Sequence, residues 1–292
     1  MLLIIQKLRA GVKKSFFKYF LIFCGILSLS LVLFSLIFIL ASAAGSLAVT
    51  FLDVGQGDSV LIKTPTDRII LIDGGPDNKI LRRLGDFLPF YRRQLDYLIF
   101  SHYHDDHITG LIEIIRRYKV KHLIYAPSDY RSPVLEELLA VIKAQDIPTT
   151  ILTSRQQLFF SAACSLDLLN PRVLGVKKNE NNSLIANLNC QGQKFLLAGD
   201  NSSQVEQALL ASSLNLTANI LKASHHGSKS ANSFRFLEVV RPAWLIISVG
   251  ADNKFRHPDS DLLVRAAQLG INVKRTDQAG SIQLIIPPLK VH

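Results

Sequence analysis

The amino-acid sequence predicts an α/β protein with two sheets flanked by helices, preceded by one apolar segment. Residues 47–101 contain mainly strand-like runs, and after them such runs alternate with helical segments. This order and number of elements fits two sheets with helices outside them. Of the 292 residues, 48% are hydrophobic, so the chain is long enough for one large domain with a substantial core.

Each element follows from the local pattern of apolar and turn residues. Short apolar runs predict strands at 47–53, 60–64, 69–73, 95–101, 121–125, 166–169, 184–188, 194–198, 219–223, 243–248, 273–276 and 281–286. Helical patterns predict helices at 108–118, 133–145, 203–211, 231–240 and 260–269. After residue 101 a strand passes through a polar loop into a helix, and α/β enzymes place their sites at such junctions.

The most informative stretch is the segment from His102 to His107, which holds three imidazoles and two carboxylates. Burying so many polar groups is costly unless each has a partner, and a divalent metal ion serves several at once. Because alternate residues of an extended segment point the same way, His102 and His104 can bind one ion. The turn into the helix redirects Asp106 and His107 toward a second ion. A solvated polar loop is the alternative interpretation.

The spacing His-x-His-x-Asp-His resembles the signature of the metallo-β-lactamase superfamily. That resemblance implies a bridging aspartate after a later strand and a further histidine beyond it. Asp200 ends the apolar run 195–200, and His225 and His226 end the run 220–228. The resemblance also implies a four-layer αββα sandwich with the metal loops gathered along one edge of the sheets.

Further segments, in the same order, make the chain similar to the metallohydrolase domain of ComEC/Rec2-type competence proteins, which take up DNA. The resemblance covers about residues 47–286. Each motif alone is a weak signal, because a Gly-Gln-Gly or Asp-Gly-Gly turn is usually only a tight turn. The segments that join the first cluster are 51–59, 71–75, 224–228 and 257–258.

The resemblance implies two divalent metal ions, Zn²⁺ or Mn²⁺, that share a water. The expected ligands are His102, His104 and Asp200 for one ion, and Asp106, His107, Asp200 and His225 for the other. Two cations lower the pKa of the shared water and neutralise charge on the attacked group, so Asp106 and Asp200 are also the expected catalytic carboxylates. Mixed nitrogen and oxygen ligands suit both metals.

Other polar side chains are expected around these ligands. His226 can orient a ligand or bind a phosphate oxygen, and an exchange of roles with His225 stays open. His257 can protonate the leaving oxygen, with a turn role as the alternative. Substrate contacts are expected from Lys222, Ser228 and Lys229. Support of the ligands is expected from Asp58, Asp73, Asn182 and Ser183.

The chain departs from the superfamily pattern in one place. Members commonly carry another histidine between the first motif and the bridging aspartate, and here that interval contains only His122, inside a strand-like run. We interpret His122 as a structural or surface residue. Asn182 and Ser183 stand near the expected position. A water, amide or hydroxyl oxygen is therefore expected to complete the coordination of the ion bound by His102 and His104.

Residues 19–44 predict a transmembrane anchor. This stretch carries no charged side chain and exceeds the roughly 20 apolar residues that cross a bilayer. Residues 1–18 contain five basic and no acidic side chains, which predicts a cytoplasmic N-terminus, a single pass through the cell membrane and an extracytoplasmic hydrolase domain at 47–292. Ala41-Ser42-Ala43 resembles a signal-peptidase site, so secretion after cleavage near Ala43 is the alternative to an uncleaved anchor.

Charge and cysteine content constrain the partners only weakly. The net charge is +10; without residues 1–18, 28 basic groups face 23 acidic ones, or +5, which is compatible with a nucleic-acid substrate and does not demonstrate one. Cys24 lies in the apolar segment. A disulfide between Cys164 and Cys190 stays open, as does their burial as free thiols.

Three functions follow as hypotheses. The resemblance implies a nuclease that cleaves DNA phosphodiesters at the cell surface, for DNA uptake or nucleotide scavenging. ComEC-type proteins carry a multi-helix channel domain, so a separate channel or competence protein is an expected partner. The alternatives are a dimetal hydrolase of a lactam, thioester, lactone or phosphonate, and a non-catalytic DNA-binding module. The full ligand set argues against the module, which gains nothing from a water-activating centre.

Overall fold

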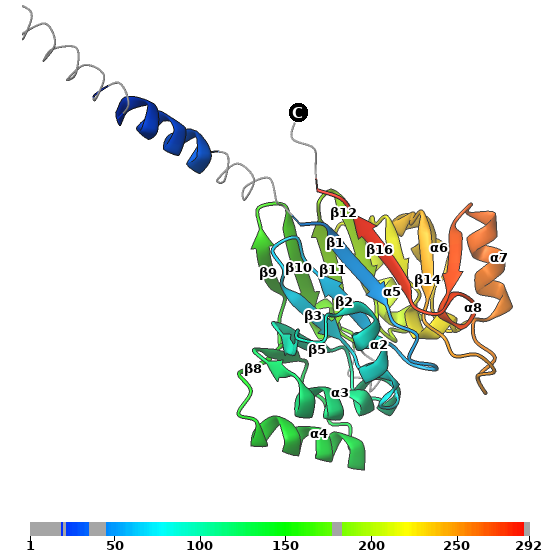
Figure 1. The fold of residues 1–292 in the computed structure, drawn as a ribbon. Helices are drawn as coiled ribbons and strands as arrows, with labels where there is room; N and C mark the ends of the chain where they lie inside the picture. The colour runs from blue at the N-terminus through cyan, green and yellow to red at the C-terminus, as the bar shows by residue number, and fades with distance from the viewer. Residues whose placement is uncertain (1–18, 20–21, 35–44, 177–182, 289–292) are drawn as a thin grey trace, which may run out of the picture. The chain divides into compact units, whose positions relative to one another are not determined.

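The computed structural model describes residues 19, 22–34, 45–176 and 183–288 (Figure 1). The chain divides into two compact units, residues 1–44 and 45–292. In the first unit residues 22–34 are helical. None of the helices formed by the described residues combines the length and the apolar character that a bilayer crossing requires. Much of the predicted anchor at 19–44, and all of the basic segment 1–18, lies outside the described residues.

The second unit contains two seven-stranded sheets. The first sheet has the order β16-β1-β2-β3-β5-β7-β8 and the second the order β15-β14-β13-β12-β11-β10-β9. The first consists of β1 (Leu47–Phe51), β2 (Val60–Lys63), β3 (Ile69–Ile72), β5 (Tyr97–Phe100), β7 (Leu123–Tyr125), β8 (Thr149–Ile151) and β16 (Ile282–Ile286). The second consists of β9 (Gln156–Ser161), β10 (Cys164–Leu169), β11 (Ile185–Cys190), β12 (Gln193–Leu197), β13 (Ile220–Lys222), β14 (Trp244–Ile247) and β15 (Asn272–Arg275). A small parallel pair joins β4 (Gln94–Leu95) and β6 (Lys119–Val120).

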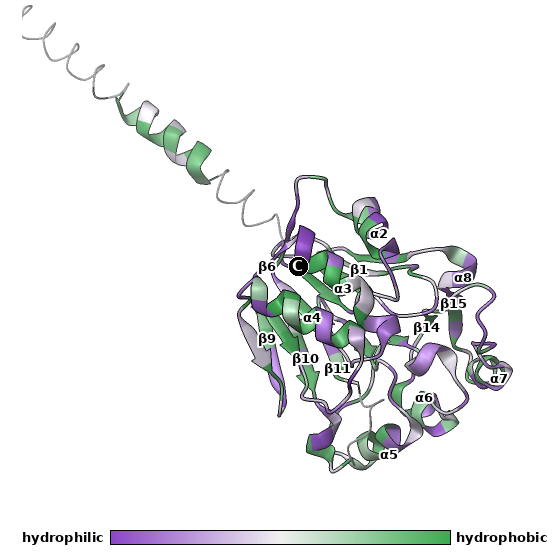
Figure 2. Ribbon diagram, turned by 90° about the horizontal axis from the view of Figure 1, so that it is seen from below, coloured by the Kyte–Doolittle hydropathy of each residue, from purple (hydrophilic) through white to green (hydrophobic). Residues whose placement is uncertain are grey.

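Helices cover the outer face of each sheet. Those associated with the first sheet are α2 (Lys79–Phe87), α3 (Asp105–Arg117) and α4 (Pro133–Ala144). Those associated with the second are α5 (Ser203–Ala211), α6 (Phe234–Val240), α7 (Ser260–Gln268), the short α8 (Thr276–Ala279) and the 3₁₀ turns η1 (Pro171–Leu174) and η2 (Ser224–Gly227). These helices carry hydrophobic and hydrophilic residues side by side, as expected of helices with one buried face (Figure 2).

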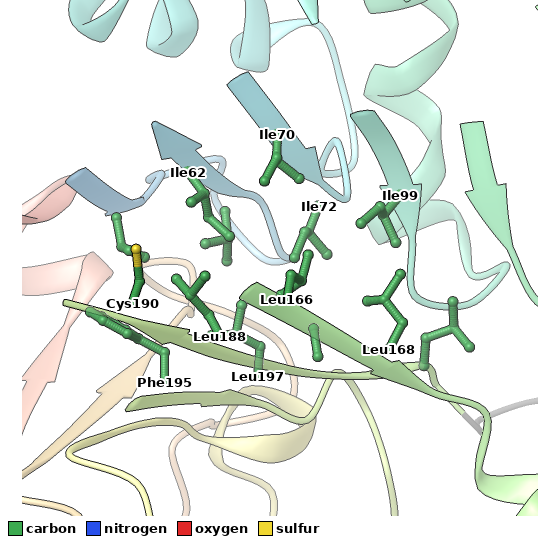
Figure 3. Close-up of a cluster of buried hydrophobic side chains, with 14 of the residues drawn as sticks. Ile62, Ile70, Ile72, Ile99, Leu166, Leu168, Leu188, Cys190, Phe195 and Leu197 are labelled. Atoms are coloured by element: carbon green, nitrogen blue, oxygen red, sulfur yellow. The ribbon is translucent and has the colours of Figure 1, made fainter. Parts of the chain in front are cut away.

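The core between the sheets arises from the two-residue period of the strands. In β3, Ile70 and Ile72 point into the space between the sheets, whereas Leu71 packs under the helices of the first sheet. In β12, Phe195 and Leu197 face the same inner space (Figure 3). Neighbouring residues of one strand therefore serve different cores, and the predicted αββα sandwich is confirmed.

Several elements differ from the predictions. Helix α2 was not predicted, because only Ile80 and Leu84 of its nine residues are buried and the apolar signal is short. Strands β8 and β9 were also not predicted. Both end a sheet, and β9 alternates between half-buried and exposed residues. Helix α6 begins at Phe234 instead of residue 231, because the Ser233 side chain accepts a hydrogen bond from Phe236 N at 3.2 Å and caps the helix there.

The disulfide left open by the sequence is present. Cys164 and Cys190 face each other in the antiparallel ladder of β10 and β11 and are bonded through their sulfurs. Both side chains are buried in the core between the sheets.

The ends of the parallel strands place the polar motifs near one another. Strands β3 and β5 are parallel neighbours, and so are β12, β13 and β14. The motifs containing Asp73 and His102 follow the first pair, and those containing Asp200 and His226 follow β12 and β13. Since carboxyl ends of parallel strands meet at one edge, both sheets contribute to a common site there.

Candidate metal centre

The first histidine motif is built at the start of α3. His102 and His104 lie in the loop after β5, and His104 is the residue that precedes the helix. Its backbone carbonyl accepts hydrogen bonds from His107 N at 2.9 Å and Ile108 N at 3.2 Å. Gly110 lets the helix approach the loop after β3, because a Cβ there would lie 2.1 Å from the carbonyl oxygen of Gly74.

Asp200 lies between the histidines of both sheets. Its Oδ2 atom is 3.5 Å from His107 Nε2 and 3.5 Å from His226 Nε2. The same oxygen is 3.9 Å from the Nε2 atoms of His102 and His225. Ligand atoms placed about 2 Å from a tetrahedral ion lie roughly 3.3–3.5 Å apart, so these separations suit atoms that share an ion.

Two groups of candidate ligands share Asp200. In one, Asp106 joins through an Oδ2 atom that lies 3.3 Å from His226 Nε2 and 3.9 Å from His107 Nε2. The groups are Asp106, His107, Asp200 and His226, and His102, His104 and Asp200; within each, the candidate ligand atoms lie within 4.8 Å of one another.

The donor atoms in these groups lack other partners. The Nε2 atoms of His102, His107 and His226 and the Oδ1 atom of Asp200 are buried and have no hydrogen-bond partner among the described residues. Each unsatisfied buried polar group costs about 1–3 kcal/mol, and four at one place are unusual in a folded protein. Imidazole nitrogens and carboxylate oxygens are donors for divalent transition metals, so the residues present fit two such ions.

The opposite ring nitrogens are held by the protein. His107 Nδ1 lies 2.9 Å from Asp73 Oδ2, and Asp73 also accepts hydrogen bonds from Ser101 N and Oγ, both at 2.7 Å. His226 Nδ1 lies 3.0 Å from the Ser248 carbonyl oxygen, to which it donates. These contacts fix the two rings with Nε2 directed at the ligand groups. Asp73 therefore has the geometry expected of a supporting residue.

Asp58 and Lys222 form a buried ion pair behind His226. Both residues are 2% exposed, and Lys222 Nζ contacts the Asp58 carboxylate and lies 3.4 Å from the Gly199 carbonyl oxygen. Asp58 Oδ1 is 3.4 Å from His226 Nδ1. Burial alone raises the pKa of Asp58, but the charges of Lys222 and His226 outweigh it and lower that pKa.

The expected substrate contact from Lys222 is therefore wrong. All three residues of β13 are buried, and Lys222 lies on the same face of the strand as Ile220, which belongs to the core between the sheets, so the Lys222 amine points into the protein. Ser228 is also buried, and its hydroxyl lies 3.0 Å from that of Ser230 within its own turn. Lys229 is exposed, and neither it nor Ser228 lines the cavity described below.

The geometry of the two adjacent histidines favours the exchange of roles that the sequence left open. Both residues have positive φ, 51° at His225 and 53° at His226, so their side chains leave a tight turn in different directions. The His226 side chain is 2% exposed and belongs to a ligand group, whereas that of His225 is 33% exposed and belongs to neither. The geometry favours His226 as the ligand that we expected His225 to be.

A cavity of about 540 Å³ opens over the ligand groups. Asp106, Asp200 and His226 lie among its lining residues, and Tyr130 and Phe255 line it as well. His257 also lines it, with its ring centroid 6.1 Å from that of His225. A substrate in this cavity can thus reach the candidate ligands from solvent.

The two carboxylates in the site remain ionised. Burial opposes the charged form of Asp106, but the nearby imidazoles of His226 and His107 lower its pKa to about 2. Burial also opposes the charged form of Asp200, and the charges of His226 and His107 hold its pKa well below the ordinary value. Two carboxylates held as anions in one buried place attract cations.

The remaining predicted residues lie near the site or away from it. His122 Nε2 is 2.8 Å from Thr150 Oγ1 and belongs to neither ligand group, in agreement with a structural role. Ser183 Oγ accepts a hydrogen bond from Asp200 N at 2.8 Å, so Ser183 holds the backbone of the bridging residue. Asn182 lies outside the described residues.

Sequence reasoning missed three residues that support the ligands. Ser101 contacts Asp73, and its Oγ lies 3.1 Å from His102 Nδ1. Asn201 donates from its side-chain amide to Ser183 O at 2.9 Å and Ala198 O at 2.6 Å. Ser101 and Asn201 directly adjoin predicted ligands and could have been suspected. The third, Ser248, acts through its carbonyl, which carries no signal in the residue type.

The fold and these ligand groups are similar to those of the metallo-β-lactamase superfamily. Residues 52–161 match that superfamily directly. Two solved structures have the same fold: a diphosphatase from the PhnP family, with a TM-score of 0.51 and 15% identity over 83% of this chain and 100% of that one, and the diiron β-hydroxylase CmlA from Streptomyces venezuelae, with a TM-score of 0.51 and 15% identity over 82% of this chain and 54% of that one.

Among curated proteins, the chain is similar to competence and recombination proteins. It is 29% identical over 265 residues to ComE operon protein 3 of Bacillus subtilis, covering 85% of this chain and 34% of that protein. It is 26% identical over 253 residues to Competence protein ComA of Neisseria gonorrhoeae, covering 81% and 32%. Recombination protein 2 of Haemophilus influenzae is 27% identical over 244 residues, covering 80% and 28%. The chain thus spans about a third of the length of these relatives.

Proposed function

We propose that this chain is a dimetal nuclease that cleaves DNA phosphodiesters outside the cytoplasm. The observation that carries the proposal is the position of Asp200 Oδ2, 3.5 Å from both His107 and His226 and 3.9 Å from His102. One carboxylate that faces imidazoles from both sheets can bridge two ions, and that arrangement is suited to activating a water between them.

Zn²⁺ or Mn²⁺ held by these residues would lower the pKa of a water and offset the charge of the attacked phosphate. The chain's own residues hold and aim that chemistry. Asp106 and Asp200 bind as anions, and Asp73 and Ser248 orient the rings of His107 and His226. Without the contacts on Nδ1, the two rings would be free to turn their Nε2 atoms away from the ions.

His257 suits a positioning role better than the proton-donor role. Burial, and then the charges of His225 and His226, lower its pKa. The imidazole is therefore mainly neutral near pH 7, where a general acid must carry its proton. A neutral ring on the wall of the cavity can still donate one hydrogen bond to a phosphate oxygen.

DNA is the proposed substrate because two of the three relatives carry names connected with competence or the competence operon, and the third with recombination. The mildly basic balance outside residues 1–18 is compatible with a polyanion. Binding should weaken as salt is added, since contacts to phosphates release counterions.

We also propose that residues 19–44 anchor the chain in the cell membrane, with residues 1–18 in the cytoplasm and the hydrolase unit outside. The uncharged apolar run and the basic residues before it support this topology. The Cys164–Cys190 disulfide supports an oxidising compartment.

A channel-forming membrane protein is the proposed partner in DNA uptake, and its recovery with the cross-linked chain from membranes tests that partnership.

The deciding experiment uses the full chain, purified in detergent, stripped of metal and reloaded with Mn²⁺ or Zn²⁺. Single- and double-stranded DNA, RNA, a phosphodiester reporter, a thioester and a β-lactam are assayed together, and bound metal is counted by mass spectrometry. We expect DNA cleavage and two ions per chain, with both lost in Asp200→Asn and reduced in Asp106→Asn. His122→Gln is the matched control, since His122 belongs to neither ligand group.

Each other outcome identifies a different function. Turnover of only the thioester or the β-lactam would replace the nuclease by a small-molecule hydrolase. Salt-sensitive DNA binding without turnover of any substrate would indicate a binding module.

A further inference from the structure

We propose that the rim of the cavity binds an unpaired nucleobase, so that the substrate is single-stranded nucleic acid. Phe255 is the stacking surface, and Lys254 and Arg256 on either side of it contact the phosphates. The inference rests on the proposed nuclease function and specifies the form of its substrate.

Phe255 is exposed where a substrate must pass. Its side chain is 54% exposed, although burying a phenylalanine contributes substantially to stability, and it lines the cavity over the ligand groups. Lys254 and Arg256 are both exposed. An aromatic ring between two cations is the combination that single-strand binding proteins use, because the ring stacks on a base and the cations follow the backbone.

The loop that carries Phe255 is fixed. The Asn253 side chain accepts a hydrogen bond from His257 N at 2.9 Å and donates to His257 O at 2.7 Å, which closes residues 253–257 into a ring. The same side chain donates to Gly250 O at 3.0 Å, and Asp259 N donates to Gly227 O at 3.0 Å, in the turn that carries His226. Phe255 is thus held outward in advance of binding, which lowers the entropy lost when a ligand stacks on it.

A series of rings leads from Phe255 toward the ligand groups. The Phe255 and His257 rings are nearly parallel, with an interplanar angle of 16° and centroids 5.9 Å apart. His257 is 6.1 Å from His225, and His225 is 6.2 Å from His226, between ring centroids. A base stacked on Phe255 would direct the strand along this series into the cavity that Asp106 and Asp200 line.

A second aromatic ring lines the cavity. Tyr130 lines it with its ring centroid 5.4 Å from that of His104, and the exposed Arg131 follows. Lys254 Nζ lies 5.1 Å from the centroid of the Phe255 ring, and its long, exposed side chain can turn from the ring to a phosphate. Bases in a duplex are already stacked and paired, so only a single strand can offer a free base face to these rings.

The test measures binding by the full chain in detergent with a chelator present, so that no cleavage occurs. The probes are a fluorescent oligothymidylate and an abasic oligonucleotide of the same length and charge. We expect Phe255→Ala to weaken oligothymidylate binding by about 5- to 150-fold and to leave abasic binding unchanged. Phe255→Trp should retain binding. Phe159→Ala is the control, since Phe159 is 73% exposed on β9 and does not line the cavity.

Lys254→Ala provides a second, independent readout. Because Lys254 is assigned to phosphate, its loss should weaken both probes equally and reduce the dependence of binding on salt by about one counterion. A loss confined to oligothymidylate would overturn that assignment.

The stacking proposal is overturned if Phe255→Ala binds oligothymidylate like the wild type, or if it loses the abasic probe to the same extent. Failure of the nuclease proposal has a different appearance: the metal-loaded wild type leaves all DNA intact while the base-dependent binding persists. If the wild type cleaves single strands and Phe255→Ala cleaves them with the same rate and KM, the stacking proposal is overturned and the nuclease proposal stands.

Discussion

Replacing Lys222 by methionine should destabilise the fold and leave substrate affinity unaffected. Methionine fills nearly the same volume, but it leaves the Asp58 carboxylate, which is 2% exposed, without its cation. Removing one partner of a buried ion pair costs about 3–5 kcal/mol, because an uncompensated charge remains in the interior. The hydrogen bond to Gly199 O, at 3.4 Å, is long and adds little.

The loss can be measured by urea unfolding followed through the fluorescence of Trp244. This is the only tryptophan of the chain. It lies in β14, the strand next to β13, and pairs with Ile220 of β13. For a urea m-value of about 3 kcal/mol/M, a loss of about 3–5 kcal/mol lowers the unfolding midpoint by roughly 1–1.7 M. Adding Asp58→Asn to Lys222→Met should recover most of it, because no buried charge is then left unpaired. Lys229→Met, at an exposed lysine, should change stability by less than about 0.5 kcal/mol.

One result would refute this reasoning. If Lys222→Met unfolds at the wild-type midpoint and instead raises the KM for DNA, the amine reaches the substrate, and the ion pair with Asp58 does not hold it inside. An equal loss of stability in Lys222→Met and in the double variant would also count against a charge effect, since it would indicate a packing defect.

Three further predictions concern stability. Replacing Cys164 and Cys190 together by alanine should cost about 3.5 kcal/mol from loop entropy for a separation of 26 residues, and reducing agent should lower the wild-type urea midpoint similarly. Burial raises the pKa of Asp96, but hydrogen bonds from a backbone N–H and two basic side chains lower it overall, so its stabilisation is complete above the ordinary value of 3.8 and is lost as the pH falls through the lowered one. The free energy of unfolding of Asp96→Asn should accordingly be lower than that of the wild type at pH 7, and the two should converge in acid. A difference that stays constant with pH would contradict this. A chelator should lower the melting temperature of the wild type, whereas Asp200→Asn should respond to neither chelator nor Mn²⁺.

The motif in the first half of the site was predictable because its geometry is local. His102, His104, Asp106 and His107 lie within six residues at a strand–helix junction, so sequence spacing alone brings them together. The joining of Asp200 to them depends on contact between two sheets. Only the family resemblance, and not spacing, indicated that partner.

The errors arose where sheet order or backbone turns decide. Lys222 points inward because its face of β13 meets the other sheet, where Asp58 lies, and no pattern within residues 220–228 gives that contact. Likewise, two consecutive residues with positive φ decide which of His225 and His226 enters a ligand group. Phe255 was not singled out because it stands in an irregular loop with no period from which to argue.

The shared position of Asp200 has a mechanical consequence. One sheet contributes His102 and His107, and the other contributes Asp200 and His226. An ion bound among them would link the two sheets. Metal binding and the packing of the two sheets against each other are therefore coupled, and each stabilises the other. Replacing Leu197, an inner-face side chain outside the ligand groups, by alanine should therefore weaken metal binding, as measured by titration of the metal-free protein.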